Sequence, residues 1–245
     1  MEPTTPTTST SVKWTLLTLE NLEEILEVNT KSFTQDPYLN YMFHEIDVAE
    51  RLPFIKAIQK AFIKQTIGSN QSYCLGDITI DGIKSLVLML PPRVPWPEDL
   101  WDIYTKKQEK LLLDRGLTVT YERFIALEEY FSERFAHYDS IEGYYLLILS
   151  TDEKYRGQGL ATKIMEVLFE KLDSEQKTCY LECTSAKLVP FYSKLGFTAL
   201  EKDKLPLVPA DINPDLVPSV TFFRRTPKPI TTPTPTSSFI SSSTS

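Results

Sequence analysis

Two glycines in a short turn are the residues of this chain best suited to bind an anion. Gly157 and Gly159 lie in the run Tyr-Arg-Gly-Gln-Gly-Leu-Ala at 155–161, between an apolar stretch at 144–149 and a helical pattern that starts near Leu160. Glycine lets the backbone approach a phosphate without a Cβ atom in the way, and a helix N-terminus adds about half a positive charge. We therefore predict that this turn binds a phosphorylated ligand, and the alternative is a turn that only reverses the chain.

Two familiar phosphate-binding motifs do not fit this turn. A Walker A loop ends in Gly-Lys-Ser/Thr, and no such sequence follows Gly159. A dinucleotide-binding turn has a third glycine, whereas Thr162 occupies that position here. Nucleotide hydrolysis and dinucleotide binding are therefore disfavoured.

A second group of residues lies downstream, on a predicted strand and a predicted short helix. The strand carries Tyr180 and Glu182, and the helix at 188–195 carries Tyr192 and is followed by Gly196. Glycine directly after a helix is a common terminator, because it adopts a positive φ without strain. A phenol and a carboxylate are both able to transfer protons.

Together the two groups resemble the motifs of the Gcn5-related N-acetyltransferase (GNAT) superfamily. The motif of that family for acetyl-coenzyme A, Gln/Arg-x-x-Gly-x-Gly/Ala, is similar to residues 156–161. Its later motif, an aromatic-Tyr pair four residues before Gly-Phe, is similar to Phe-Tyr at 191–192 before Gly-Phe at 196–197. The resemblance is specific over residues 144–200, and the distance between the motifs also fits.

The resemblance implies acetyl-coenzyme A as the acyl donor. Backbone N–H groups of the glycine turn would hold its pyrophosphate, with Arg156 adding charge. The end of the apolar strand would run beside the pantetheine arm like an added strand, and a backbone N–H near Leu149 would polarise the thioester carbonyl. The donor-binding residues that the resemblance implies are Leu149, Ser150, Thr151, Arg156, Gly157, Gln158, Gly159, Leu160, Ala161 and Thr162.

The same resemblance implies catalytic residues. Tyr192 would be the general acid that protonates the departing thiolate, and the alternative is a tyrosine that only packs beside its aromatic neighbours. The general base follows from position rather than from the resemblance: Glu182 is expected first, because a strand limits its motion, and Glu142 second, because it precedes the central strand. A solvated carboxylate is the alternative for each. Related small-molecule enzymes often carry His-Trp-Tyr-Leu at the start of the central strand. This chain has Gly-Tyr-Tyr-Leu there, so Tyr144 or Tyr145 is expected to line the site.

Hydrophobic periodicity predicts alternating strands and helices. The Asp-Gly pair at 81–82 predicts a hairpin turn, Asp-Pro at 36–37 predicts a break, and the prolines between 91 and 97 predict an irregular segment. The predicted strands are 12–19, 72–80 with a break near Gly76, 83–90, 144–149, 178–183, 197–201 and 220–225. The predicted helices are 21–33, 48–67, 98–114, 121–137, 160–172 and 188–195.

These elements agree with the fold that the resemblance implies, an α/β (α+β) GNAT fold with a mixed central sheet flanked by helices. We expect the N-acetyltransferase domain at 12–225, between disordered tails rich in Thr, Ser and Pro at 1–11 and 226–245. A helical insertion at about 91–142 precedes the coenzyme-binding strand. It is interpreted as a lid or a wall of the acceptor site, and the alternative is a subunit interface.

Charge and composition disfavour several kinds of partner. A net charge of −7 over 245 residues leaves no broad basic face for nucleic acid. No apolar run approaches the roughly 20 residues of a membrane span, and residues 1–11 lack the features of a signal peptide. The three cysteines and two histidines show no metal-ligand spacing. We expect a cytoplasmic protein without a metal, as a monomer or homodimer.

The predicted function is N-acetyl transfer from acetyl-coenzyme A to an amine. Direct attack in a ternary complex is expected, because no residue is placed as a covalent nucleophile. The acidic net charge and the insertion favour the amine of a small molecule. Two alternatives remain open at this point: a protein acetyltransferase acting on an α-amino group or a lysine, and a non-catalytic module that binds acyl-coenzyme A.

Overall fold

The computed structural model describes residues 14–68, 74–79, 81–94, 96, 98–138, 140–207 and 213–230. The tail predicted at 1–11 and the part of the C-terminal tail beyond residue 230 lie outside the described residues. No helix in the described ranges combines the length and the apolar character that a bilayer span requires.

One seven-stranded sheet organises the described part of the chain, in the order β1-β2-β3-β4-β5-β7-β6. Every neighbouring pair is antiparallel except β4 and β5, which are parallel. A parallel pair needs a crossover connection, which the helix between these two strands supplies. The strands are β1 Trp14–Leu16, β2 Leu75–Thr79, β3 Gly82–Leu90, β4 Tyr144–Thr151, β5 Cys179–Cys183, β6 Thr198–Lys204 and β7 Ser219–Arg225.

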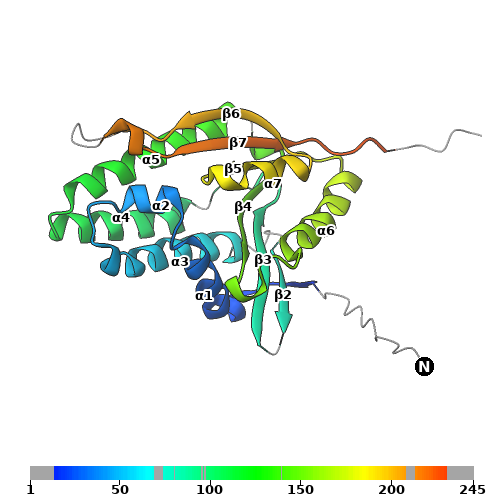
Figure 1. Ribbon diagram of the computed structural model, residues 1–245, viewed down its shortest axis with the longest axis horizontal. Coiled ribbons are helices and arrows are strands. Elements are labelled where there is room, and N and C mark those ends of the chain that lie inside the picture. Colours follow the sequence, from blue (N-terminus) through cyan, green and yellow to red (C-terminus); the bar gives the residue numbers. More distant parts are fainter. Residues whose placement is uncertain are drawn as a thin grey trace, which may run out of the picture.

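Helices cover both faces of this sheet (Figure 1). α6 and α7 pack on one face through a core that includes Ile164 and Leu168, and α1 and α3 pack on the other face through Ile25 and Ile63. The helix predicted at 160–172 from hydrophobic periodicity is confirmed, and the apolar residues Ile164, Leu168 and Leu172 are fully buried. The helices are α1 Leu22–Phe33, α2 Pro37–Met42, α3 Leu52–Gly68, α4 Glu98–Asp114, α5 Thr118–His137, α6 Leu160–Ser174 and α7 Val189–Lys194.

The predicted insertion forms a third packing region beside the sheet. α4 and α5 pack against α2 and α3 and against the inner face of β7, with Phe124 and Leu127 in the shared core. Phe131 of α5 lies 6.4 Å from Phe222 of β7, ring centre to ring centre. The insertion therefore covers the end of the sheet where β7 and β6 lie.

Several predicted boundaries were wrong by a turn or less, and each has a local cause. The helix predicted from residue 48 begins at Leu52, because residues 48–50 form a separate 3-10 turn. The break predicted at 36–37 is the start of α2, where the Asp36 carboxylate accepts the backbone N–H of Leu39 as an N-cap. The strand predicted to break near Gly76 is continuous from 75 to 79 and has a register shift after Asp77.

Candidate functional site

β4 and β5 separate soon after they begin. Tyr144 pairs with Cys179 and Tyr145 pairs with Tyr180, and the ladder ends there. β4 nevertheless continues to Thr151, so the edge that it turns toward β5 is left unpaired along most of its length. Unpaired N–H and C=O groups on a strand edge can bind an extended ligand as an added strand.

A bulge in β4 lies at the point where the two strands part. Leu88 of β3 faces Ile148, whereas the next residue, Met89, faces Leu146, so Leu147 is an extra residue without a partner on β3. The bulge reverses the side-chain alternation of β4. Leu146 consequently packs in the core under α6, while Ile148 packs in the core under α1.

The end of β4 is anchored by polar side chains rather than exposed to the gap. Ser150 Oγ donates to Asn29 Oδ1 of α1 at 2.6 Å, and Ser85 Oγ donates to the carbonyl oxygen of Ser150 at 3.0 Å. Ser85 Oγ also lies 3.0 Å from Thr151 Oγ1. Of the three strand residues predicted to run beside the donor, Leu149 is half-buried against the α6 core. The hydroxyl proton of Ser150 is therefore already used within the chain and is not free for a ligand.

The predicted phosphate turn has the backbone geometry that anion binding requires. Gly157 and Gly159 both have left-handed backbones, with φ of 76° and 74°, and a Cβ atom at either position would meet no atom within 4 Å. Gly159 is the N-cap of α6 and offers no side-chain hydrogen bond to the helix. The N–H groups of Leu160, Ala161 and Thr162 therefore lack an intrahelical acceptor.

The charge around this turn is favourable for an anion. α6 runs for 15 residues with its N-terminus at the turn, so the positive end of its dipole lies there. Arg156 Nε donates to the carbonyl oxygen of Thr151 at 3.3 Å, which keeps the guanidinium beside the end of β4. Residues 156–162 thus gather N–H donors and a positive charge around an open space.

Tyr192 lies on the α6 side of the sheet. Its side chain is only 8% exposed, and its ring packs edge-on against Phe191 and Phe197. Burial raises the pKa of its phenol, with the neighbouring thiols of Cys183 and Cys179 adding to the effect. Within the described part of the chain its hydroxyl has no hydrogen-bond partner, so this protonated phenol has a proton to donate.

Glu182 lies on β5, on the opposite face from Tyr192. The residues on either side of it along the strand, Leu181 and Cys183, belong to the α6 core, so Glu182 points toward α2 and α5. Its carboxylate accepts a hydrogen bond of 2.6 Å from the hydroxyl of Tyr145. Burial raises the pKa of Glu182 to about 7, and the bond from Tyr145 partly opposes that rise.

Glu142 has a different environment. It lies in the 3-10 turn before β4, and Arg93 donates to its carboxylate at 2.8 Å in an exposed ion pair. This pair holds the pKa of Glu142 below its usual range. A carboxylate already paired with a guanidinium is a weaker base than Glu182, so the geometry favours Glu182.

Asp36 is a largely buried carboxyl that was not among the predicted catalytic residues. Its carboxylate accepts a hydrogen bond of 2.5 Å from Thr184 Oγ1, just after β5, and burial raises its pKa. The sequence predicted a break at the Asp-Pro pair but not the helix that Asp36 caps. No group of three His, Cys, Asp or Glu side chains in the described ranges, His44 and His137 included, could hold a metal ion.

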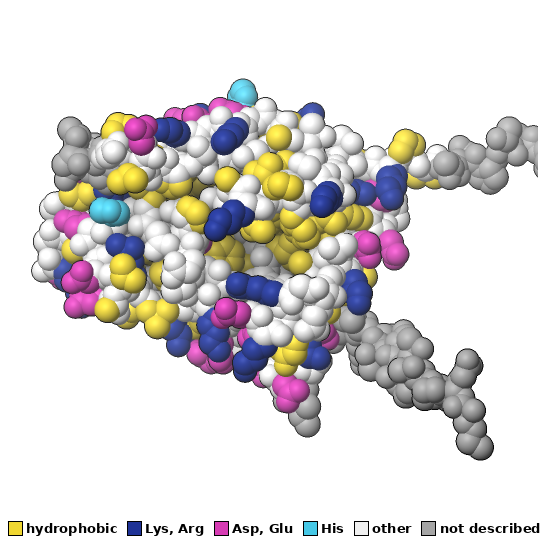
Figure 2. Space-filling model, viewed as in Figure 1, with side chains coloured by type: hydrophobic (Ala, Val, Ile, Leu, Met, Phe, Trp, Pro, Cys, Tyr) yellow, Lys and Arg dark blue, Asp and Glu magenta, His cyan; other side chains and the backbone are white. Residues whose placement is uncertain are grey.

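The site lies under a hollow in the middle of one face of the molecule (Figure 2). Hydrophobic side chains line this hollow, and Lys and Arg side chains stand around its rim. A long, apolar ligand with anionic groups suits such a surface.

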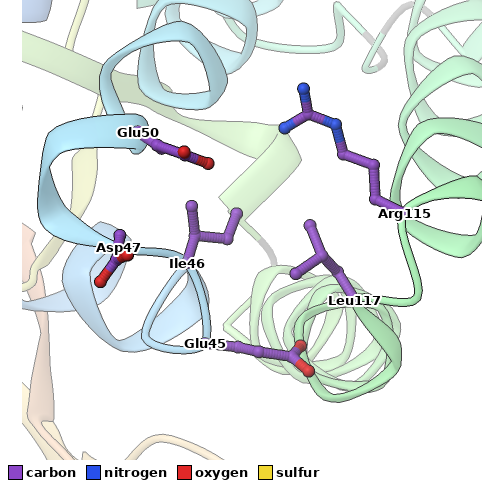
Figure 3. A pocket seen from close by; sticks show the side chains of 6 residues that line it. All are labelled: Glu45, Ile46, Asp47, Glu50, Arg115 and Leu117. Carbon is purple, nitrogen blue, oxygen red and sulfur yellow. The ribbon is translucent and has the colours of Figure 1, made fainter.

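A second hollow of about 460 Å³ lies away from β4 and β5 (Figure 3). Its walls come from the segment after α2 and from the turn between α4 and α5. The Glu45 carboxylate caps α5 by accepting the backbone N–H of Thr120 at 2.9 Å, so this acid has a structural role. The pocket is lined by Glu45, Ile46, Asp47, Glu50, Arg115 and Leu117.

Comparisons with known proteins agree with this geometry. Residues 121–199 match the family model described as an acetyltransferase (GNAT) domain. A comparison with curated protein sequences finds no match.

Solved structures of low sequence identity share the fold. A polyamine N-acetyltransferase from Drosophila melanogaster is 12% identical with a TM-score of 0.59, over 88% of this chain and 100% of that one. Arylalkylamine N-acetyltransferase 2 from Aedes aegypti is 16% identical with a TM-score of 0.56, over 87% and 98%. A protein from Corynebacterium glutamicum described as histone acetyltransferase HPA2 and related acetyltransferase is 15% identical with a TM-score of 0.53, over 89% and 98%. The GNAT fold predicted from the sequence is confirmed.

Proposed function

We propose that this chain, an acyltransferase with a GNAT domain, moves an acetyl group from acetyl-coenzyme A to the amine of a small molecule. One observation carries the proposal. The gap between β4 and β5 has the glycine turn at the N-terminus of α6 at its end, a protonated phenol on one face, at Tyr192, and a buried carboxyl on the other, at Glu182.

The donor fits the gap as an added strand. Its pyrophosphate would accept hydrogen bonds from the N–H groups of residues 157–162, and its pantetheine arm would pair with the free edge of β4. The backbone N–H of Leu149 is a candidate to polarise the thioester carbonyl. The N–H of Asp152 bonds to Lys84 of β3, and bonded and non-bonded pairs alternate along an antiparallel ladder, so Leu149 opposite Val87 turns its N–H toward the gap.

The chemical step is a direct transfer. The acceptor enters as an ammonium and loses one proton to Glu182, and its nitrogen then attacks the thioester carbon. The C–N bond forms and the C–S bond breaks, and the sulfur takes the phenolic proton of Tyr192. The nitrogen, which still carries two protons after the attack, gives one of them to the Tyr192 phenolate directly or through water. Solvent then removes the proton from Glu182, which restores both groups and releases the one net proton of the reaction.

The acceptor face is enclosed by aromatic side chains. The ring of Phe135 on α5 lies 5.2 Å from that of Tyr145, and the ring of Phe131 lies 5.5 Å from that of Tyr38. Aromatic walls this close to Glu182 leave room for a compact amine rather than an extended protein segment. This supports a small molecule as the acceptor.

Mass spectrometry after incubation with acetyl-coenzyme A tests the proposal. The full chain is given a mixture of small amines and, separately, a mixture of peptides with free N-termini and lysines. We expect acetylated small amines and equimolar release of free coenzyme A thiol. Acetylated peptides without acetylated amines would make the chain a protein acetyltransferase, and donor binding without thiol release would make it a binding module.

A further inference from the structure

Three carboxyl groups lie around the Tyr38 phenol on the acceptor face of the sheet, and the region between them is the space considered below. Asp36 precedes α2, Glu128 lies on α5, and Glu182 lies on β5. Each is deep enough for burial to raise its pKa, and yet each side chain keeps some accessible surface. Because these carboxyl groups keep some accessible surface, a small ligand can reach them.

Tyr38 connects these carboxyl groups. The charges of Asp36 and Glu128 both act on its phenol, and its phenol in turn acts on Tyr145, the hydrogen-bond partner of Glu182. Thr184 provides a second link, because it donates to Asp36 and follows Glu182 by two positions along the chain. Two positions along a strand span roughly 7 Å, so Asp36 and Glu182 lie within reach of one small ligand.

The hydrogen bonds in this space leave the negative charge unmatched. Asp36 accepts from Thr184 and from a backbone N–H, Glu128 accepts from Trp101 Nε1, and Glu182 accepts from Tyr145. A carboxylate has about four acceptor sites, so each retains capacity. None of the three forms an ion pair with a Lys, Arg or His of the described residues.

Two phenols in the same space also lack partners. The hydroxyls of Tyr38 and Tyr104 form no hydrogen bond within the described ranges, although burial raises the pKa of both phenols. Their charge neighbours include Glu128 in both cases, which places the two phenols around the same carboxylate. A polar group left unpaired at this depth costs about 1–3 kcal/mol unless a ligand or water satisfies it.

Aromatic faces surround Glu128. The ring of Trp101, which donates to Glu128, stacks on Phe62 at 5.5 Å and lies 5.0 Å from the ring of Tyr104. Trp96 lies edge-on to Trp101 at 5.5 Å. Aromatic faces beside a carboxylate attract an ammonium group through both charge and cation–π interactions.

We propose that the acceptor is an aliphatic diamine, with one nitrogen reacting beside Glu182 and a second ammonium held by Glu128 and Asp36 between Tyr38 and Tyr104. This inference rests on the proposed function. A monoamine would leave the second pair of carboxylates unmatched, whereas a diamine matches both ends of the space. The methylene chain between its nitrogens packs against the aromatic walls.

The test compares two amines with the same number of heavy atoms, putrescine and n-pentylamine. Steady-state kinetics of the full chain measure kcat/KM for each amine at a fixed, saturating concentration of acetyl-coenzyme A. We expect kcat/KM for putrescine to be higher by about tenfold or more, because a buried charge-assisted contact contributes on that scale. The difference should appear mainly in KM, since the second ammonium is bound alike before and during reaction.

Glu128→Gln is the decisive variant. Glutamine keeps an oxygen that can accept from Trp101 but removes the charge, so the putrescine to n-pentylamine ratio should fall by about threefold or more. Asp36→Asn should lower the ratio too. If this variant does not fold because the N-cap of α2 is weakened, Glu128→Gln alone decides the test. Glu50→Gln, in the separate hollow of Figure 3, is the control and should leave the ratio unchanged.

The outcomes separate this inference from the proposed function. Equal kcat/KM for the two amines in the natural chain would overturn the diamine assignment and leave acetyl transfer to small amines standing. An unchanged ratio in folded Glu128→Gln would overturn it as well. If neither amine nor any other in the mixture is acetylated, both the inference and the proposed function fail.

Discussion

The hydroxyl of Tyr145 donates a 2.6 Å hydrogen bond to the carboxylate of Glu182 across the point where β4 and β5 part. Tyr145 and Tyr180 form the last pair before β4 and β5 separate, so this hydrogen bond crosses the gap at the point where it begins. Burial and this bond act on the pKa of Glu182 in opposite directions and leave it at about 7. A group with that pKa can both accept a proton and release it near neutral pH.

Tyr145→Phe should move the pH dependence of the reaction. A general base works only when ionised, so kcat/KM of the natural chain should rise with pH through about 7. Removing the phenol deletes the bond that lowers the pKa of Glu182, and the rising limb should then move to higher pH. The measurement is a profile of kcat/KM against pH for both proteins, with an expected loss near neutral pH that recovers in alkaline buffer.

Tyr144→Phe is the matched control for this experiment. The two tyrosines are adjacent, but the hydroxyl of Tyr144 donates to Glu175 at the C-terminal end of α6, at 2.6 Å. Removing the hydroxyl of Tyr144 should therefore leave the rising limb of the pH profile at the same pH as in the natural chain. Identical profiles for all three proteins would contradict the role of Glu182 as the base.

Glu182→Gln should stabilise the fold in alkaline buffer while it lowers turnover. The pKa of Glu182 is raised in the folded state, to about 7 from an ordinary value of 4.5, so the folded chain holds the proton more tightly than the unfolded chain. The free energy of unfolding therefore falls as pH rises between these two values, and the full cost is present above the folded pKa. Glutamine does not ionise, so the variant does not lose this unfolding free energy as the pH rises.

The measurement is the melting temperature of both proteins at about pH 5 and about pH 8. The variant should melt a few degrees higher at the alkaline pH, with a much smaller difference at the acidic pH. A gain of the same size at both values would mean that packing, rather than ionisation of Glu182, sets the difference.

The elements of the candidate donor site could be predicted from the sequence because they are contiguous. The strand, the glycine turn and the first turn of α6 follow one another within residues 144–162, so local patterns were enough to place them. The positive φ at Gly157 and Gly159 is the property that the two glycines indicated. The C-terminal stop of α7 at Gly196, with φ of 88°, was local in the same way.

The acceptor side could not be predicted, because it is assembled from distant parts of the chain. Asp36 and Thr184 are 148 positions apart and yet share a hydrogen bond. The bulge at Leu147 depends on how β3 pairs with β4, and no residue type in the strand marks it. The raised pKa of Glu182 comes from burial under elements that are distant in the sequence. The local sequence around Glu182 therefore does not show whether its pKa is raised or ordinary.

Gly159→Ala should weaken donor binding more than it weakens the fold. Gly159 has φ of 74°, a conformation that costs an L-residue about 1–2 kcal/mol, and the added methyl group would enter the open space of the phosphate turn. KM for acetyl-coenzyme A should rise, while KM for the amine should change little. Initial rates over a range of donor concentrations measure this.

Gly116→Ala is the control for backbone strain. Gly116 has φ of 71° and open space around its Cβ position, but it lies in the turn between α4 and α5. Both variants should lose a similar amount of unfolding free energy, and only Gly159→Ala should raise KM for the donor. A similar rise in both would show that general destabilisation, rather than loss of the phosphate contact, is responsible.

Glu142→Gln should lower turnover less than Glu182→Gln does. Glu142 is held in an exposed ion pair with Arg93, and its pKa is lowered by that partner. Exposed ion pairs contribute about 0–1 kcal/mol, so the fold should also tolerate the change. Single-turnover rates of the two variants, measured side by side, decide between the two carboxylates, and a larger loss for Glu142→Gln would move the base to that residue.

Tyr192→Phe should slow the reaction and leave donor binding intact. The phenol is buried against Phe191 and Phe197, and phenylalanine keeps the ring that packs there. What is lost is the proton for the departing thiolate, so kcat should fall by about a hundredfold. Titration calorimetry with coenzyme A should give the same affinity for both proteins, and Tyr144→Phe should retain turnover. The loss in Tyr192→Phe should also shrink with acyl donors whose thiols are more acidic, because such a thiolate leaves without a proton. An equal loss for every donor would mean that Tyr192 positions the donor through packing instead.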